Sequence, residues 1–349
     1  MADRGRRWTV LVTGASTGLG LALARRLIHT RHRLILTARA SSLARFADAG
    51  VSDDGEHVHL RALDVTSAAQ RHDVIEEAEA RWGGVDALIN NAGVMYRAVL
   101  EHVDDAERLA QMDINCLAPL DLIRLVLPGM RARRAGRIIN VSSVSGMMAM
   151  PTMAAYSASK FALEGATEAL YYEVRPWNIK VSLVQPGFIH SESYRNVRLT
   201  DASSRSLDDV DEAYHAHYEH MQPFVERLMD ASRSTPDRVA RTIVRTLQRR
   251  RPPLRVPATL DAWVFAALRR LLPRSIYHWV LYRNLPAIRT WGLPPGDREP
   301  ARPAASPAGA VEVGAGEAEP ELATAAPLGL EVERSGAATA AGPPPGPRR

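Results

Sequence analysis

Short apolar runs alternate with longer amphipathic stretches over most of the chain. The apolar runs predict strands at residues 8–12, 33–38, 57–63, 85–89, 137–141, 180–184 and 254–256. The amphipathic stretches predict helices at residues 21–27, 68–82, 106–133, 156–174 and 236–250. This alternation is typical of an α/β domain with a doubly wound parallel sheet and helices on both faces. In such a sheet, ligands bind beyond the carboxyl ends of the strands.

A glycine-rich turn joins the first strand to the first helix. Its candidate ligand-binding residues are Thr13, Gly14, Ser16, Thr17, Gly18, Leu19 and Gly20. Glycines allow backbone N–H groups to approach a pyrophosphate at a helix N-terminus, where the helix dipole favours an anion. The G-x-x-x-G-x-G spacing differs from the G-x-G-x-x-G fingerprint, but it allows the same contact. The turn therefore predicts a dinucleotide site, with a purely structural turn as the alternative.

Arg39 follows the second strand, and no acidic residue stands between Thr37 and Phe46. At this point an acidic residue would bind the 2′-hydroxyl of NAD, whereas an arginine accommodates the 2′-phosphate of NADP. Arg39 therefore favours NADP(H), unless it is only a solvated surface arginine. At the next strand end, Asp64 can accept a hydrogen bond from adenine, or it can cap the helix that begins near Ser67.

Other strand ends carry small or amide residues that suit tight turns against a cofactor. They add Val65, Asn91, Ala92, Gly93, Pro186 and Gly187 to the candidate cofactor site. Because the carboxyl ends of parallel strands meet at one edge, we expect all of these segments to lie together.

Tyr156 and Lys160 stand four residues apart, so a helix places both side chains on one face. A phenol has a pKa of about 10, and a nearby ammonium lowers it, which makes Tyr156 a usable general acid or base. Ser143 stands thirteen positions before Tyr156 and can hydrogen-bond a substrate oxygen. Asn115 interrupts a predicted helix, and Pro119 cannot bond the carbonyl of Asn115, which predicts a kink.

Taken in order, these motifs resemble those of the short-chain dehydrogenase/reductase family, which has a Rossmann fold. The resemblance covers roughly residues 8–190. It implies that Tyr156 exchanges a proton with the substrate and that Lys160 lowers its pKa and holds the nicotinamide ribose. It also implies that Ser143 polarises the carbonyl and that Asn115 supports a water relay to Lys160.

The resemblance further implies that the backbone near Ile189 and the hydroxyl of Ser191 hold the nicotinamide carboxamide, although the family often has threonine in this stretch. His190 is either a substrate contact or a surface residue. Ser142 and Ser145 compete with Ser143, but the thirteen-residue spacing selects Ser143. Four methionines precede Tyr156 and suit either a lipophilic pocket wall or ordinary core packing: Met147, Met148, Met150 and Met153.

The composition divides the chain into three parts. Residues 1–258 form the predicted catalytic domain. Its polar connection at 188–235 has only weak helical patterning from residue 192 on, so we expect it to be functional or mobile. The family resemblance implies that this connection covers the substrate. Residues 259–293 form a basic amphipathic extension, broken by prolines, which binds an anionic membrane or packs on the protein or a second subunit. The extension is loosely similar to that of hydroxysteroid and retinol dehydrogenases. Residues 294–349 form a Pro/Ala/Gly-rich tail that we expect to be disordered.

Composition and charge narrow the setting. The single cysteine, Cys116, excludes an intrachain disulfide and suits a reducing, cytoplasmic location. The chain has a net charge of +5, but its aromatic residues are not interleaved with its basic residues. We therefore expect no nucleic-acid partner. We also expect no signal peptide and no membrane-spanning helix.

The sequence therefore predicts an NADP(H)-dependent oxidoreductase without a metal. Its expected substrate is a lipophilic secondary alcohol or ketone, or an alcohol or aldehyde. The alternative is a non-catalytic dinucleotide sensor or scaffold protein on the same fold.

Overall fold

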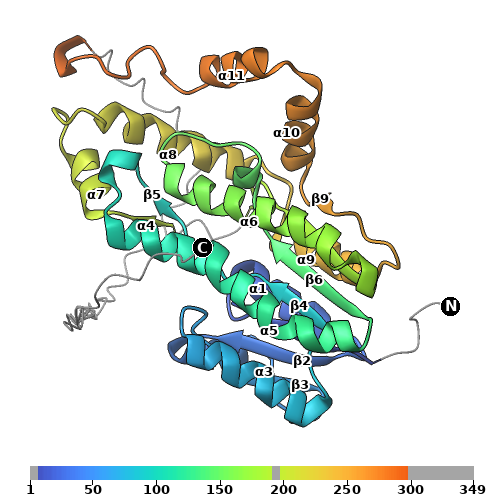
Figure 1. Ribbon diagram of the computed structural model, residues 1–349. Coiled ribbons are helices and arrows are strands. Elements are labelled where there is room, and N and C mark those ends of the chain that lie inside the picture. The colour runs from blue at the N-terminus through green and yellow to red at the C-terminus, as the bar shows by residue number, and fades with distance from the viewer. Residues whose placement is uncertain (1–6, 191–196, 298–349) are drawn as a thin grey trace, which may run out of the picture. The chain divides into compact units, whose positions relative to one another are not determined.

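The computed structural model describes residues 7–190 and 197–297. Its centre is a parallel sheet in the order β3-β2-β1-β4-β6-β7-β9 (Figure 1). These strands are β1 (Thr9–Val12), β2 (Arg33–Ala38), β3 (Val58–Ala62), β4 (Ala87–Asn90), β6 (Gly136–Val141), β7 (Ile179–Gln185) and β9 (Arg255–Pro257). The chain runs outward from β1 to β3 and then crosses back to β4, on the other side of β1. This reversal is the topological switch point where α/β sheets bind ligands, and it confirms the predicted Rossmann topology.

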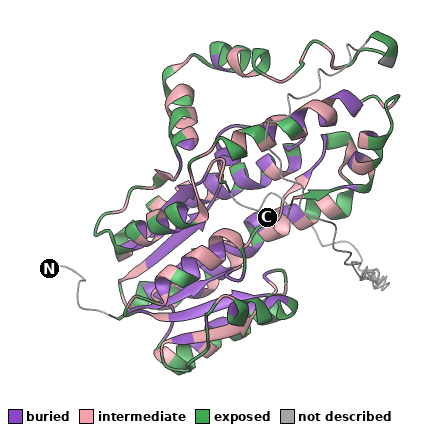
Figure 2. Ribbon diagram, turned by 180° about the vertical axis from the view of Figure 1, so that it is seen from behind, coloured by how far each residue is buried: buried purple, intermediate pink, exposed green. Residues whose placement is uncertain are grey.

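Helices cover both faces of the sheet, because alternate strand residues point to opposite sides. Val10 and Val12 pack on one face with α1 (Gly18–Leu27) and α9 (Pro236–Gln248). Leu11 packs on the other face with α3 (Ala68–Trp82), α5 (Ala118–Ala132) and α6 (Ala154–Glu173). Figure 2 shows the sheet as a buried layer between these helices.

The predicted helix 106–133 is interrupted. It consists of α4 (Asp105–Met112), a π-helical turn at Asp113–Leu117 and then α5. Pro119 has no N–H to donate to the carbonyl of Asn115, so one regular α-helical hydrogen bond is lost next to the π-helical turn. The helix is therefore irregular where the kink was predicted, and Asn115 lies inside the π-helical turn, a feature that often accompanies functional sites.

The connection predicted at 188–235 is more structured than the sequence suggested. It contains β8 (Arg198–Leu199), α7 (Asp201–Asp208) and α8 (His215–Asp230). The prediction of weak structure was wrong because α8 has a narrow apolar stripe among many polar residues. Three side chains of this stripe are buried: Tyr218, Met221 and Val225. β8 pairs in parallel with β5 (Tyr96–Arg97) in a second, two-stranded sheet.

The basic extension forms α10 (Leu260–Leu271) and α11 (Arg274–Arg283), which are separated by Pro273. Its inner face carries Phe265 and Tyr277 and packs in one cluster with Met147 and Met148. Its outer face is largely exposed (Figure 2). Trp263 and Trp279 on that face are 63% and 57% exposed. The extension therefore packs on the catalytic domain and still presents an apolar outer surface. Of the predicted tail, residues 298–349 lie outside the described part of the chain.

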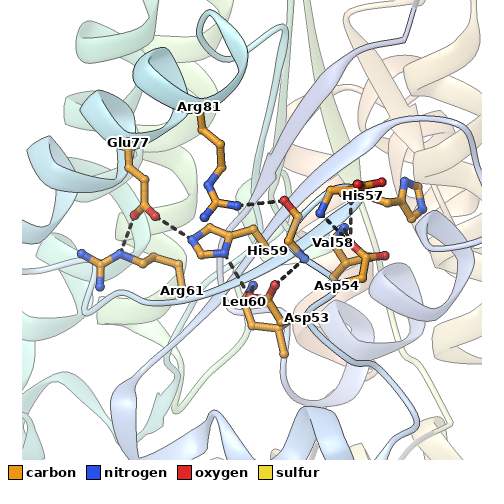
Figure 3. A network of polar contacts seen from close by, with 11 residues as sticks. Asp53, Asp54, His57, Val58, His59, Leu60, Arg61, Glu77 and Arg81 are labelled. Carbon is orange, nitrogen blue, oxygen red and sulfur yellow. Dashed lines mark hydrogen bonds and ion pairs between the residues drawn. The ribbon is translucent and has the colours of Figure 1, made fainter.

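A polar network fastens the edge strand β3, as Figure 3 shows. Asp54 accepts hydrogen bonds from the backbone N–H groups of Glu56, His57 and Val58 at 3.0, 2.6 and 2.8 Å. These bonds lower the pKa of Asp54. A second cluster contains Asp53, His59, Arg61 and Glu77, in which His59 lies between the two carboxylates. The network holds β3 against α3 and so fixes the strand that leads to Asp64.

Candidate active site

A cavity of about 680 Å³ lies at the carboxyl ends of the central strands. It is lined by nearly every predicted cofactor residue, which brings together segments from the whole catalytic domain. These residues are Gly14, Ser16, Thr17, Gly18, Leu19, Gly20, Arg39, Asp64, Val65, Asn91, Ala92, Gly93, Pro186, Gly187 and Ile189. Ser143, Tyr156 and Lys160 line the same cavity. Ser191 lies outside the described residues.

The glycine-rich turn has no room for a side chain at Gly14 or Gly20. Gly14 has a φ of +63°, and a Cβ there would lie 2.8 Å from the Cα of Ala92. A Cβ on Gly20 would lie 2.0 Å from the carbonyl oxygen of Gly14. The turn therefore packs directly against the β4 loop and against the first turn of α1. Thr17, the N-cap residue of α1, makes no side-chain capping bond. This arrangement fits a phosphate at the helix N-terminus.

Thr13 does not line the cavity but holds two of its walls together. Its hydroxyl accepts hydrogen bonds from the backbone N–H groups of Asn91 and Ala92, both at 3.0 Å. The side-chain amide of Asn91 donates to the carbonyls of Thr13 and Gly14 at 3.1 and 2.9 Å. The two loops therefore form one rigid unit beneath the cavity.

Two arginines stand at the end of the cavity nearest β2. Arg39 lines it as predicted, and Arg45 and Ser42 line it as well. Both guanidinium groups are exposed, and neither forms an ion pair within the part of the chain that the structure describes. Arg45 was not predicted, because it lies on the short helix α2 (Ala44–Asp48) and not directly after the end of β2.

Asp64 lines the cavity, and the structure tests the capping role that was predicted for it at the next helix. Its carboxylate accepts from the backbone N–H and the hydroxyl of Thr66 at 3.0 and 2.8 Å. Ser67, not Asp64, is the N-cap of α3 and accepts from the N–H of Gln70. The capping interpretation of Asp64 was therefore wrong, and its carboxylate stays at the cavity wall.

Ser143 and Tyr156 both line this cavity. Burial raises the pKa of Tyr156, and the side chain of Ser143 opposes that shift. The hydroxyl of Ser142 instead donates to Glu164 at 2.8 Å, away from this pair. Ser143 lines the cavity together with Tyr156, and its choice as the catalytic serine stays a prediction.

Lys160 is buried beside this pair. Its ammonium nitrogen lies 5.9 Å from the centre of the Tyr156 ring and donates to the carbonyl of Val141 at 3.2 Å. Burial lowers the pKa of Lys160 to about 8, and the nearby carboxylate of Glu164 opposes that shift. Burial is the largest influence on the pKa of Tyr156 in this arrangement, and the lowering of that pKa by Lys160 stays a prediction.

Asn115 lies behind the catalytic residues rather than on the cavity wall. Its side-chain amide donates to the carbonyl of Val94 at 2.8 Å and to the hydroxyl of Ser159 at 3.0 Å. Its side-chain oxygen accepts from the N–H of Val94 at 2.9 Å. Asn115 therefore ties the β4 loop to α6, on which Tyr156 and Lys160 stand. The predicted water relay stays a prediction.

A second, smaller cavity of about 220 Å³ adjoins the first. The two share Leu19, Met95, Ser143, Tyr156, Gly187 and Ile189. Its other apolar wall residues are Val144, Met150, Met153, Phe188, Val225, Met229 and Pro236. Two of the four methionines before Tyr156 therefore face a cavity, whereas Met147 and Met148 pack against the extension. His190 is 61% exposed beside Asp230 and lines neither cavity.

The extension reaches back to the Pro186-Gly187 loop. The hydroxyl of Thr259 accepts from the N–H of Gly187 at 2.9 Å, and Asp261 accepts from the N–H of Phe188 at 2.8 Å. A Cβ on Gly187 would lie 1.7 Å from an oxygen of Asp261. The first turn of α10 therefore clamps the loop between the cavities, a contact that no motif in the sequence signalled.

The described residues contain no group of three His, Cys, Asp or Glu side chains arranged to hold a metal ion. None of their helices combines the length and apolar character needed to cross a membrane.

Comparisons with known proteins agree with this fold. The profile of the short chain dehydrogenase family matches residues 8–202. A 3-ketodihydrosphingosine reductase of Bacteroides thetaiotaomicron is 32% identical over 281 residues, which cover 80% of this chain and 98% of that protein. Human retinol dehydrogenase 8 is 33% identical over 252 residues, 71% of this chain and 80% of its own.

Solved structures give the same result. A short-chain dehydrogenase from Streptomyces avermitilis aligns with a TM-score of 0.65 at 29% identity, over 80% of this chain and 98% of that one. A metagenomic short-chain oxidoreductase aligns with a TM-score of 0.55 at 26% identity, over 72% of this chain and 96% of that one. The chain therefore belongs to the short-chain dehydrogenase family.

Proposed function

We propose that the protein is an NADP(H)-dependent oxidoreductase that interconverts a secondary alcohol and a ketone on a lipophilic substrate. One observation carries the proposal. Ser143 and Tyr156 lie where a large cavity with a glycine-rich floor adjoins a small cavity with apolar walls. The larger cavity suits a dinucleotide, and the smaller one suits the body of an apolar substrate.

In this proposal the cofactor supplies or accepts the hydride, and the protein supplies orientation and proton transfer. During ketone reduction, Tyr156 donates its phenolic proton to the carbonyl oxygen while Ser143 hydrogen-bonds that oxygen. Lys160 would hold the nicotinamide ribose, and its ammonium would favour the phenolate that remains after proton donation. Asn115 positions α6 through its bonds to Val94 and Ser159.

The choice of NADP(H) rests on Arg39 and Arg45. Both line the end of the cavity nearest β2, where the 2′-phosphate of the adenosine would lie. A guanidinium binds a phosphate through paired, charge-assisted hydrogen bonds. The metagenomic relative was solved in complex with NADP, which supports the same choice.

The lipophilic substrate is supported by the methionine-rich wall of the smaller cavity. Thioether side chains adapt to apolar groups of different shapes. The names of two relatives, a 3-ketodihydrosphingosine reductase and a retinol dehydrogenase, point in the same direction. Neither name fixes the substrate of this protein.

A turnover assay tests the proposal. NADPH oxidation is followed with a panel of steroid, retinoid, fatty-acyl and small ketones and aldehydes, and the reverse reaction with the matching alcohols. The proposal expects turnover with NADPH and an apolar carbonyl compound. Tight NADPH binding without turnover across the whole panel would favour the non-catalytic sensor instead.

We also propose that the outer face of the extension seats the enzyme on an anionic membrane from the cytoplasmic side. Its exposed Trp263 and Trp279 are accompanied by the exposed arginines Arg270 and Arg274. Tryptophan and basic residues together are typical of helices that lie in a membrane interface. Arg255 adds little to the positive charge of this surface, since it forms ion pairs with Glu164 and Glu168.

A further inference from the structure

Arg97 is a buried cation in the wall of the smaller cavity. It lies on β5 and is only 7% exposed. Its Nε atom is buried, and no hydrogen-bond partner for it exists among the described residues. Within those residues its guanidinium also has no ion pair. The walls around it are otherwise mainly apolar, and they include Met95, Met153 and Val225.

Such a group is costly to leave unpaired. Burying an ion without a hydrogen-bonded partner costs several kcal/mol, whereas an apolar side chain at this position would incur no such cost. Burial lowers the pKa of Arg97, and the carboxylate of Glu226 on α8 opposes that shift. Glu226 accepts a hydrogen bond from Gln222 at 3.2 Å and does not approach Arg97 within ion-pair distance. The Glu226 carboxylate therefore offsets part of the charge of Arg97 but accepts no hydrogen bond from its guanidinium.

Arg97 also shares its cavity with the catalytic pair. Ser143 and Tyr156 line the same space of about 220 Å³. A molecule that occupies this smaller cavity with its carbonyl at Tyr156 therefore lies within the space that Arg97 lines. The guanidinium is a planar fork of donors that matches a carboxylate, and it is more weakly hydrated than an ammonium group.

Resting on the oxidoreductase function proposed above, we propose that Arg97 binds a carboxylate on the substrate. The substrate class is then an apolar keto acid and its hydroxy-acid counterpart, with the acid group on Arg97 and the reacting carbon at Tyr156. A carboxylate fits better than a phosphate dianion, because the cavity offers one buried cation whose charge Glu226 already offsets in part. Arg97 would bind the substrate away from the reacting atoms and so set specificity.

The test compares three substrates that share one apolar chain: a keto acid, its methyl ester and the ketone without the acid group. The wild-type enzyme should reduce the acid with a kcat/KM about 10- to 100-fold above the other two, the range expected for hydrogen bonds to a charged group. The preference should appear mainly in KM, because the contact is the same before and during the reaction.

Arg97→Met should remove that preference while it retains NADPH affinity and turnover of the ester. Arg97→Lys should keep part of the preference for the keto acid, since lysine keeps the positive charge but lacks the planar pair of guanidinium donors. Arg227→Met is the matched control, because Arg227 is an exposed arginine next to Glu226 on α8. It should change neither substrate selectivity nor stability.

The outcomes separate this inference from the proposed function. If the wild-type enzyme reduces all three substrates equally, or Arg97→Met keeps the preference for the acid, the assignment of Arg97 is wrong and the oxidoreductase function stands. If Arg97→Met and Arg97→Lys lose acid and ester turnover equally, with a lowered melting temperature, Arg97 is structural and the inference is overturned. If the wild-type enzyme reduces no carbonyl compound at all, the proposed function itself fails. The wild-type comparison needs no variant and decides the matter even if Arg97→Met does not fold.

Discussion

Removal of the arginines at the β2 end of the larger cavity should change the cofactor preference. Arg39 and Arg45 both line this end, and both are exposed. A charge-assisted hydrogen bond contributes about 1.5–3 kcal/mol, and exposure to solvent places these two at the lower end. About 1.4 kcal/mol corresponds to a tenfold change in affinity. Arg39→Ala should therefore weaken NADPH binding about tenfold, and the double variant with Arg45→Ala about a hundredfold.

The assay is a fluorescence titration of NADPH and NADH into the wild-type and variant proteins at two ionic strengths. NADH has no 2′-phosphate, so its affinity should change little in any variant. The advantage of NADPH should shrink at high salt, because exposed charges are screened. Arg108→Ala is the matched control, since this exposed arginine pairs with Asp105 on α4, away from the cavity.

Two results would refute this reasoning. Equal loss of NADPH and NADH affinity would mean that Arg39 supports the fold of the site rather than the phosphate. A wild-type preference for NADH would remove the basis of the assignment altogether. An effect of Arg39→Ala without any effect of Arg45→Ala would confine the phosphate site to Arg39.

Two further predictions concern Lys160 and the extension. The kcat/KM for ketone reduction should fall as the pH rises through about 8, because the Lys160 ammonium loses its proton there. Glu164→Gln should move this fall to lower pH, since the Glu164 carboxylate favours the ammonium. The intact protein should co-sediment with anionic vesicles, more weakly at high salt. Replacement of Trp263 and Trp279 by serine should release it, at about 2 kcal/mol per side chain.

Each of these predictions has a clear contrary result. A Glu164→Gln profile that is unchanged, or shifted to higher pH, would contradict the assigned electrostatics of Lys160. Protein that stays in the supernatant with every lipid and salt concentration would exclude the membrane proposal and favour a lid or a subunit contact. Phe265→Ser is the control for the extension, because Phe265 packs on the inner face and its loss should lower stability instead of releasing the protein.

The fold could be predicted from the sequence because the apolar period changes clearly between strands and helices. Residues 33–38 and 68–82 match β2 and α3 at both ends. The kink near Asn115 followed from the missing N–H of Pro119. Helix α8 was not predicted, because its buried apolar residues form only a narrow stripe. The histidines and glutamates around this stripe give the segment the pattern of a polar loop.

The cofactor side of the candidate site was predictable for a different reason. Its residues occupy strand ends, and the topology alone brings parallel strand ends to one edge. Arg97, Thr259 and Asp261 carry no such local signal. Their positions depend on how β5 and α10 pack against the catalytic domain, which spacing along the chain does not encode. The roles of the catalytic residues remain predictions that kinetics must test.

The most direct test of the central claim is the Tyr156→Phe variant in a hydride-transfer assay with NADPH and the best ketone of the panel. Phenylalanine keeps the ring in the cavity wall and removes the proton donor. Turnover should fall by about 10²- to 10⁴-fold, the range typical of acid–base catalysis, while NADPH affinity stays near the wild-type value. A variant that binds NADPH and reduces the ketone at close to the wild-type rate would contradict the mechanism.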